Sequence, residues 1–413
     1  MSLRSDLGEL TPQQRKVIVA SYLGWTLDAF DFFLLVFVIK DIAAEFSTTI
    51  EGVTIAILLT LAMRPVGALL FGLAADRWGR RPTLMANILL YSGVEFASGL
   101  SPNLTVLIIL RAIYGIAMGG EWGVGASLAM ETIPVKIRGL ISGVLQAGYP
   151  SGYLIASLVF FLLFSTIGWR GMFFVGAAPA LLVLYIRSHV EESPVFLARQ
   201  MEEARPNLWQ VVRSNLRLAI WAILLMTAFN LFSHGTQDLY PTFLQVQRGF
   251  DTHTVGLIAI VFNIGAIIGG LTFGHLSDLI GRRTAIVIAA LCAIPMIWPW
   301  AYGSTPVVLA IGAFLIQFFV QGAWGVVPVH LNELSPDEVR GTFPGVVYQL
   351  GNLLASANAT MQASIAVHNN GDYAYALALV AGIVGVIVAL LAGFGFEAKG
   401  VHFGPAHTRE AAA

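Results

Sequence analysis

Charged residues are scarce in this chain: Asp, Glu, Lys and Arg make up 11% of its 413 residues, whereas 57% are hydrophobic. Soluble domains carry about 25% charged residues, so this composition excludes a soluble globular protein. The single cysteine, Cys292, excludes an internal disulfide bond and a cysteine metal site. The chain contains neither a phosphate-binding loop nor a histidine or cysteine cluster with metal-ligand spacing. We therefore expect no ATP hydrolysis, no enzymatic activity, no cofactor and no bound metal.

The hydrophobic residues gather into segments that are long enough to span a bilayer as helices. Twelve such segments are found, at residues 17–39, 53–74, 83–100, 104–126, 140–163, 170–187, 218–243, 254–275, 284–302, 306–329, 342–366 and 373–396. The first is too long for a cleavable signal peptide. The longest polar interval between segments, 188–215, is predicted to be a soluble linker. The sequence thus predicts an all-α membrane protein with twelve transmembrane helices.

The positions of Lys and Arg predict which side of the membrane each loop faces. If the N-terminus is cytoplasmic, eighteen of the 23 basic residues fall in inside segments and three in outside segments. Basic residues favour the cytoplasmic side of a membrane. We therefore expect a multi-pass protein of the inner cell membrane with both termini in the cytoplasm.

The second half of the chain repeats the first. Eleven residues recur at an offset of 202 residues, among them Asp76 with Asp278 and Arg80 with Arg282. Halves of the same topology are related by an axis along the membrane normal, with a site between them near the midplane. The predicted organisation is two pseudo-symmetric six-helix bundles, 1–187 and 218–396, joined by a cytoplasmic linker, 188–217, and followed by a tail, 397–413.

Three stretches resemble signatures of the major facilitator superfamily. G-L-A-A-D-R-W-G-R-R (72–81) and G-H-L-S-D-L-I-G-R-R (274–283) are similar to its cytoplasmic loop signature, and R-A-I-Y-G-I-A-M-G-G (111–120) is similar to its fourth-helix signature. Glycines let helix ends approach closely, and an aspartate can hold an opposing helix N-terminus and arginines by charge-assisted hydrogen bonds. We interpret four residues as structural or gating groups: Asp76, Arg80, Asp278 and Arg282.

One predicted span contains a dense polar segment, N-L-F-S-H-G-T-Q-D-L-Y-P-T (230–242), directly after an apolar run. Polar and ionisable groups inside a membrane are costly and therefore indicate a function. The alternative is that they hydrogen-bond neighbouring helices. On a helix Asn230, His234 and Asp238 lie on one side, with Gln237 close by. Gly235 and Pro241 are expected to loosen or kink the helix.

This segment matches N-x-x-[S/T]-H-x-[S/T]-Q-D-x-x-x-T, the motif of the Jen-type monocarboxylate–proton symporters, at every specified position. The stretches L-D-A-F-D-F-F (27–33) and G-G-E-W-G (119–123) also resemble the wider sialate–proton symporter group. Sialate carriers of that group have two further spans at mid-chain, and the 188–215 linker has none. The resemblance implies transport of lactate, pyruvate or a similar short acid.

An anionic substrate needs a cation inside the membrane, and two arginines lie within the predicted spans. Arginine can bind a carboxylate through two parallel hydrogen bonds. Arg64 is predicted to lie at the middle of its helix, and we favour it over Arg111 as the carboxylate ligand. Either arginine could instead form a structural ion pair with Asp28, Asp31 or Glu95, and for Arg111 we favour that interpretation.

The rest of the acid needs neutral hydrogen-bonding groups. Candidates for this role are Asn230, His234, Gln237, Tyr149, Gln349 and Asn352. For the last three, packing between helices is the alternative role.

Proton coupling needs a group that titrates between the two conformational states. Carboxylic acids in low dielectric hold their protons more tightly, and histidine titrates near neutral pH. Candidates for proton coupling are Asp28, Asp31, His234, Asp238, Arg111, Glu121 and Glu95. His234 and Asp238 could share a proton as a coupled pair. Glu121 lies toward the cytoplasmic side and could instead brace the gate.

The sequence therefore predicts a monomeric secondary carrier that moves a small monocarboxylate together with protons, with membrane lipids and no nucleic acid as its other partners. Two alternatives stay open. One is a proton symporter for aromatic acids, dicarboxylates or sialate on the same fold, and the other is a sensor or channel built on a carrier's scaffold.

Overall fold

Long α-helices account for nearly all of the described chain, which comprises residues 10–48, 50–200, 213–397 and 399–401 of a computed structural model. The helices of the first half are α2 (Pro12–Glu45), α3 (Ile50–Trp78), α4 (Arg80–Gly99), α5 (Leu104–Thr132), α6 (Arg138–Gln146), α7 (Gly148–Val175), α8 (Ala180–His189) and α9 (Pro194–Gln200). Those of the second half are α11 (Leu216–Gln237), α12 (Tyr240–Thr242), α13 (Thr252–Ile280), α14 (Arg282–Tyr302), α15 (Pro306–Leu334), α16 (Phe343–Ala355), α17 (Asn358–His368) and α18 (Tyr373–Gly393).

The twelve predicted spans correspond to this series of helices. Within the described residues, nine helices are long and apolar enough to cross a membrane by themselves. Of the other three spans, the third is α4, which buries the polar side chains of Asn87, Ser92 and Glu95. The fifth is divided between α6 and α7, and the eleventh between α16 and α17. Glycine allows the turn between the fifth and sixth spans, because Gly168 in α7 has φ of +62°.

Capping residues mark where several spans begin. The side chains of Asn103, Asp251 and Thr305 accept hydrogen bonds from backbone amides in the first turns of α5, α13 and α15. Such caps satisfy amides that have no partner within the helix. Polar loop residues thus set the helix boundaries.

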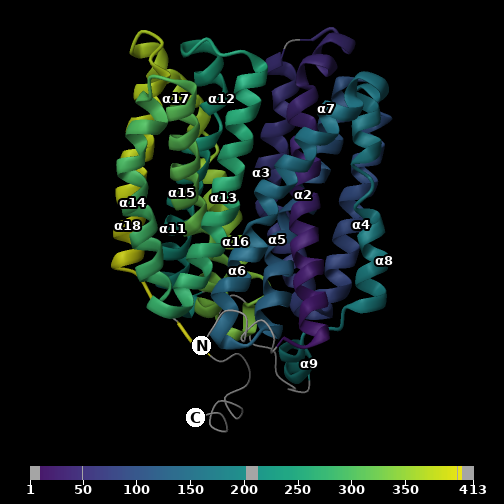
Figure 1. The fold of residues 1–413 in the computed structure, drawn as a ribbon. Coiled ribbons are helices and arrows are strands. Elements are labelled where there is room, and N and C mark those ends of the chain that lie inside the picture. The colour runs from purple at the N-terminus through teal and green to yellow at the C-terminus, as the bar shows by residue number, and fades with distance from the viewer. Residues whose placement is uncertain (1–9, 49, 201–212, 398, 402–413) are drawn as a thin grey trace.

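The two halves of the chain stand side by side, with the first half at the right of Figure 1 and the second at the left. Across the interface, α6 of the first half packs against α13 and α15, and α16 of the second half packs against α3 and α5. The end of the molecule that carries α9 and the turns after α3 and α13 is called the linker end here.

At the linker end, each half caps a helix of the other half. Asp278 in α13 accepts hydrogen bonds from the backbone amides of Gly139 and Leu140 at 2.8 and 2.9 Å, in the first turn of α6. Asp76 in α3 accepts from the amide of Gly341 at 3.0 Å and from the hydroxyl of Thr342 at 2.5 Å, just before α16. A negative charge at a helix N-terminus is favourable. The two contacts follow the sequence repeat and tie the halves together.

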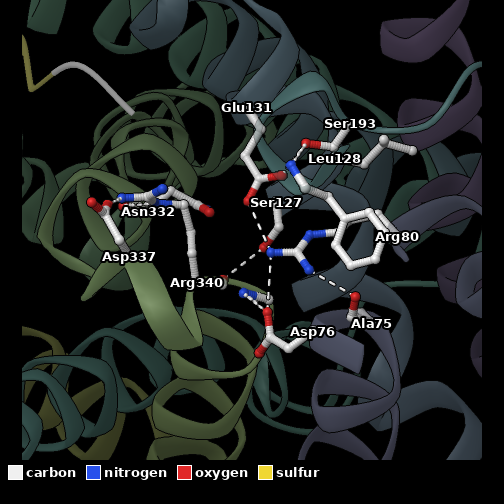
Figure 2. A network of polar contacts seen from close by, with 12 residues as sticks. Ala75, Asp76, Arg80, Ser127, Leu128, Glu131, Ser193, Asn332, Asp337 and Arg340 are labelled. Atoms are coloured by element: carbon white, nitrogen blue, oxygen red, sulfur yellow. Dashed lines mark hydrogen bonds and ion pairs between the residues drawn. The ribbon is translucent and has the colours of Figure 1, made fainter. Parts of the chain in front are cut away.

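Each aspartate also belongs to a buried ion-pair network. Arg80 contacts Asp76 and Glu131, both at 3.0 Å (Figure 2). Its counterpart Arg282 lies 2.7 Å from Asp278 and makes two bonds to Glu333, at 2.9 and 3.0 Å. The residues predicted to act at the gate therefore meet in two equivalent clusters.

A third contact joins the two halves beside the network of Asp76, Arg80 and Glu131. The hydroxyl of Ser127 donates a 2.9 Å hydrogen bond to the carbonyl oxygen of Arg340 (Figure 2). Glycines permit this approach, since a Cβ atom on Gly123 would lie 2.8 Å from the Cα of Gly345. The linker end is thus closed by direct packing of backbone on backbone.

We predict that losing either cap opens the linker end. A hydrogen bond to a charged group contributes roughly 1.5–3 kcal/mol, so Asp76→Ala or Asp278→Ala should raise the open population by about tenfold or more. Replacing Cys292 by Ser and the buried interface residue Ala68 by Cys makes a single-thiol reporter. Its reaction rate with a water-soluble maleimide should rise by that factor in both variants.

Asp251→Ala provides the matched control for this experiment. It removes the same type of cap, a 2.9 Å bond to the amide of Thr254, from the opposite end of α13. Its labelling rate should equal that of the unaltered reporter. Equal rates in all three aspartate variants would mean that the caps do not hold the gate.

Candidate functional site

The polar segment of the seventh span ends its helix early. Helix α11 ends at Gln237, α12 covers Tyr240–Thr242, and a π-helical turn, η2, follows at Phe243–Gln247. The predicted interruption of this span is therefore confirmed. The break leaves His234, Gln237 and Asp238 at the last turn of α11, where their side chains reach a cavity between the two halves.

This main cavity has a volume of about 330 Å³. Aromatic side chains of both halves supply much of its wall, namely Phe32, Phe33, Tyr149, Tyr153, Tyr240 and Phe262. The polar groups on its wall are fewer: His234, Gln237, Asp238, Asn263 and Gln321. An apolar wall with a few placed polar groups is typical of a small-molecule site.

A second, deeper cavity of about 20 Å³ adjoins the first. The two cavities share Tyr149, His234 and Gln321. The deep cavity is also lined by Trp25, Arg64, Gln146, Asn230, Ser233, Trp324 and Tyr348. Along α3, the main-cavity residues Ile57 and Leu61 precede Arg64, and Asp76 follows it. The main cavity thus lies on the side of Arg64 that is away from the closed linker end.

Arg64 brings a buried cation to the deep cavity. Its side chain is 3% exposed, its Nη2 donates to the sulfur of Met118 at 2.6 Å, and its guanidinium carbon lies 5.4 Å from the ring centroid of Phe32. No carboxylate in the described part of the chain lies within 4.0 Å of it, and its Nε has no hydrogen-bond partner there. Arg64 therefore has donors left for an anion.

Arg111 is bound differently. Its Nη2 lies 2.6 Å from Oε2 of Glu95 and 2.6 Å from Oγ of Ser98, and its guanidinium carbon lies 4.3 Å from the ring centroid of Tyr114. Arg111 lines neither of the two cavities. The structure therefore places it in the buried ion pair that was the favoured interpretation from sequence.

Besides Glu95, which is ion-paired with Arg111, three carboxyl groups of the first half are buried without hydrogen-bond partners in the described residues: those of Asp28, Asp31 and Glu121. The first two are fully buried, and Glu121 is 1% exposed. Glu121 sits against Gly24, one turn before Asp28, and lines a small space with Ser21 and Trp25. An ionised carboxylate in such a place is costly unless it is compensated, so all three are suited to carry a proton.

His234 and Asp238 form the contact that their spacing predicts. Nδ1 of His234 lies 3.1 Å from Oδ1 of Asp238, and both side chains are partly exposed toward the cavity. Asn352 also contacts His234 by a side-chain hydrogen bond. The amide of Asn352 donates to Oε1 of Gln349 at 3.4 Å. Gln349 is fully buried and lies outside both cavities, behind Asn352.

The remaining predicted residues are also located. Tyr149 stacks on Trp25 with ring centroids 5.5 Å apart, and it lines both cavities. Asn230 is buried and donates a 2.8 Å bond to the carbonyl of Met226 in its own helix. The side chain of Thr242, the last position of the motif, lies outside the described residues.

Comparison with known proteins identifies the fold. A family model described as Major Facilitator Superfamily matches residues 21–359 and 239–401. The chain belongs to the major facilitator superfamily. It is therefore a multi-pass membrane protein and a secondary transporter of a small solute, and it is not an enzyme.

Solved structures share the fold at low sequence identity. The proton:xylose symporter XylE superposes with a TM-score of 0.77 at 19% identity and covers 94% of this chain and 97% of its own. The human organic anion transporter MFSD10 superposes with a TM-score of 0.69 at 16% identity and covers 92% of this chain and all of its own. These matches confirm the predicted twelve-helix, two-bundle architecture.

Three curated relatives resemble the transporter over most of its length. The sialic acid transporter NanX of Escherichia coli is 29% identical over 95% of this chain and 96% of its own. A carboxylic acid transporter protein homolog of Saccharomyces cerevisiae is 28% identical over 87% of this chain and 63% of its own. A probable 4-methylmuconolactone transporter of Cupriavidus pinatubonensis is 29% identical over 87% of this chain and 85% of its own.

Sequence reasoning missed several residues that line the transporter's cavities or bind the side chains that do. Gln317 and Gln321 are two amides spaced i, i+4 in the apolar tenth span, which is the same signal that singled out the seventh span. Gln317 hydrogen-bonds Gln237 at 3.0 Å, and Gln321 hydrogen-bonds Ser233 at 2.9 Å. Trp324 and Tyr348 gave no signal, because aromatic residues are common in apolar spans.

The different surroundings of Arg64 and Arg111 predict that replacing them lowers the stability of the transporter by different amounts. Arg111→Met leaves Glu95 buried without its cation, which should cost roughly 3–5 kcal/mol of unfolding free energy. Arg64→Met breaks no ion pair among the described residues and should cost about 1 kcal/mol or less. Denaturant unfolding in detergent micelles measures both losses. Equal losses in the two variants would contradict the assignment of Arg111 as the structural arginine.

Proposed function

We propose that this transporter is a proton-coupled symporter of short monocarboxylates, with lactate and pyruvate as its substrates. The observation that carries the proposal is Arg64, a buried guanidinium that lines the deep cavity and lies in no ion pair among the described residues. A buried cation with no carboxylate within 4.0 Å favours an anionic ligand.

The carboxylate of the acid would bind Arg64 through two parallel hydrogen bonds. A guanidinium matches a carboxylate in geometry, and a bond to a charged group is roughly twice as strong as a neutral one. Tyr149 and Tyr348 line the same cavity and bring hydroxyl groups close to this position. Arg111, held by Glu95, would position the buried carboxyl groups of the first half instead.

The body of the acid would extend from Arg64 into the main cavity. Tyr149, His234 and Gln321 line both cavities, so a substrate held at Arg64 passes them. Asn230, His234 and Gln237 would supply polar contacts from α11. Asn352, supported by Gln349, would orient the imidazole of His234.

A proton would enter with the anion. The buried carboxyl groups of Asp28, Asp31 and Glu121, and the His234–Asp238 pair, are the groups suited to accept it. Protonation removes a negative charge from the interior when the substrate adds one, so the loaded carrier keeps its charge balance and can reorient. An acidic outside would therefore drive uptake.

Alternating access would be a rocking of residues 1–187 against residues 218–396. The linker end is closed by the Asp76 and Asp278 caps, whereas the main cavity lies on the side of Arg64 that is away from the linker end. Basic residues favour a cytoplasmic linker end and cytoplasmic termini, so this conformation would face outward. Opening the caps would then release the acid into the cell.

The curated relatives support an acid as the substrate. Two of them are named for transport of a carboxylic acid and of sialic acid. The seven-position match to the Jen-type motif points to a short acid among these possibilities. Both observations agree with a cation at the centre of the site.

The aromatic wall of the main cavity favours a second candidate, a proton symporter of aromatic acids. Tyr149 stacks on Trp25, and the rings of Phe33 and Tyr153 are 4.3 Å apart at their centroids. Aromatic side chains in offset or edge-on arrangement bind a ligand ring favourably. A single arginine fits a single carboxylate, so the dicarboxylate alternative has less support.

Uptake by purified transporter in proteoliposomes tests this function. With an acidic outside, labelled lactate should accumulate, and unlabelled pyruvate should compete better than benzoate, succinate or sialate. Arg64→Ala should lower lactate binding about 100-fold or more, because it removes the charged ligand. Arg248→Ala, a basic residue bound to a carbonyl outside the cavities, should bind lactate normally. Stronger competition by benzoate would select the aromatic acids, and normal binding in Arg64→Ala would exclude Arg64 as the ligand.

Removing the titratable pair should abolish the response to a proton gradient. We expect His234→Ala and Asp238→Asn to lose accumulation against a gradient while counterflow exchange of labelled for unlabelled lactate persists. The reason is that the coupled pair, which would share the proton that offsets the charge of the anion, is lost in either variant. The measurement compares accumulation and counterflow in the same vesicles. Unchanged proton-driven accumulation in both variants would remove the pair from the proton path.

A further inference from the structure

A chain of hydrogen bonds leads from the backbone of α11 to the wall of the main cavity. It begins at Thr236, whose hydroxyl lies 3.0 Å from the carbonyl oxygens of Phe232 and Ser233. A carbonyl oxygen can only accept, so the one hydroxyl hydrogen of Thr236 points at the backbone. The oxygen of Thr236 is left to accept a hydrogen bond.

That oxygen determines the orientation of Gln317. The side-chain amide of Gln317 lies 2.9 Å from Oγ1 of Thr236, and the atom facing Thr236 must be its Nε2. Gln317 is fully buried in α15, and its Oε1 therefore points the other way, toward Gln237. The direction of each bond follows from its neighbour.

Gln237 is oriented in turn. Its Nε2 lies 3.0 Å from Oε1 of Gln317 and 3.1 Å from Oγ of Ser233. Both contacts are made by the nitrogen, so its carbonyl oxygen Oε1 is the atom left for the main cavity, whose wall includes Gln237. No donor among the described residues binds this oxygen. The wall thus presents a hydrogen-bond acceptor with a fixed orientation.

We propose that Thr236 and Gln317, acting through Gln237, make the transporter select 2-hydroxy acids over the matching 2-oxo acids. This inference rests on the proposed function. A 2-hydroxyl group can donate a hydrogen bond to Oε1 of Gln237. A 2-oxo group instead places its own acceptor oxygen against Oε1 of Gln237, so that neither oxygen has a donor. Gln237 lies three residues from His234 on the same face of α11, next to the entrance of the deep cavity.

The burial of Thr236 and Gln317 keeps Gln237 in one orientation and so maintains the preference for 2-hydroxy acids. Both side chains are fully buried, so turning the Gln237 amide would leave Oε1 of Gln317 without a donor inside the protein. The net contribution of one ordinary hydrogen bond corresponds to a preference for the hydroxy acid of about five- to tenfold in affinity. Thr236 and Gln317 are positioning residues, because neither lines the cavity.

The test compares affinities for acids that differ only at the second carbon. Binding of lactate, pyruvate and propionate is measured with purified transporter, together with the larger pair mandelate and phenylglyoxylate. The unaltered transporter should bind each hydroxy acid about five- to tenfold more tightly than its oxo partner. Thr236→Val keeps the shape of the side chain but loses the hydroxyl, and the ratio should fall to about one. Propionate affinity should not change, since propionate has no group at that carbon.

Further variants distinguish a loss of the Gln237 orientation from a general loss of structure in the transporter. Thr236→Ser keeps the hydroxyl and should keep the ratio, and Gln317→Leu should lose it as Thr236→Val does. Gln362→Leu is the matched control, because Gln362 also holds α11, through a 2.7 Å bond to the carbonyl of Gly235, but is not part of the chain. It should leave the ratio unchanged even if all affinities fall together.

Two results would overturn the inference in different ways. If the acids bind to the unaltered transporter but oxo acids bind as well as hydroxy acids, or if Thr236→Val keeps the ratio, the orientation of Gln237 does not set selectivity. If no monocarboxylate of either size binds, the proposed function itself fails and the inference fails with it.

Discussion

An ionised side chain inside a membrane has to be compensated by a partner, and this constraint accounts for where the charged residues of the transporter lie. Arg80, Arg111 and Arg282 each face a carboxylate of a neighbouring helix. Arg64 has no carboxylate within 4.0 Å in the described residues, and the carboxyl groups of Asp28, Asp31 and Glu121 in the same half have no hydrogen-bond partner there. The compensated charges hold the structure together, and the uncompensated ones mark the place where an anion and a proton can enter.

Because of the sequence repeat, the same arrangement of charged residues occurs twice at the linker end. An aspartate of one half caps a helix of the other half, and that aspartate is held by an arginine that is itself paired with a glutamate. Because each half both donates and accepts a cap, the halves separate only when both contacts break. Contacts of this kind form or break as a unit, which suits a transporter that alternates between two conformations.

The main cavity combines an apolar wall with a strip of polar side chains. Buried residues that do not line the cavity fix the orientation of side chains in this strip. Gln237 reaches the cavity, but Thr236 and Gln317, which decide its orientation, are buried between α11 and α15. His234 likewise contacts Asn352, which lines neither cavity. Recognition in such a site is set by the groups that fix the contacting side chains as much as by the contacts themselves.

Local properties of the sequence were sufficient for the spans, the repeat and the polar segment of the seventh helix. Span length and apolarity act residue by residue, and the backbone must satisfy its hydrogen bonds within each helix, so these features can be read along the chain. The break after Gln237 and the contact of His234 with Asp238 follow from spacing on one helix. The orientation of the termini and the domain boundaries remain predictions.

Contacts between helices decided the rest. The sequence favours an ion pair for Arg111 but leaves three carboxylates as its partner, and only the helices packed against it show that this partner is Glu95. The sequence alone could not pair Asp278 with α6 or Gln317 with Thr236, because these residues are more than 80 positions apart. The sequence by itself determined which groups enter the membrane. The tertiary structure decided which of them are compensated there, since compensation depends on distances between helices that no local pattern encodes.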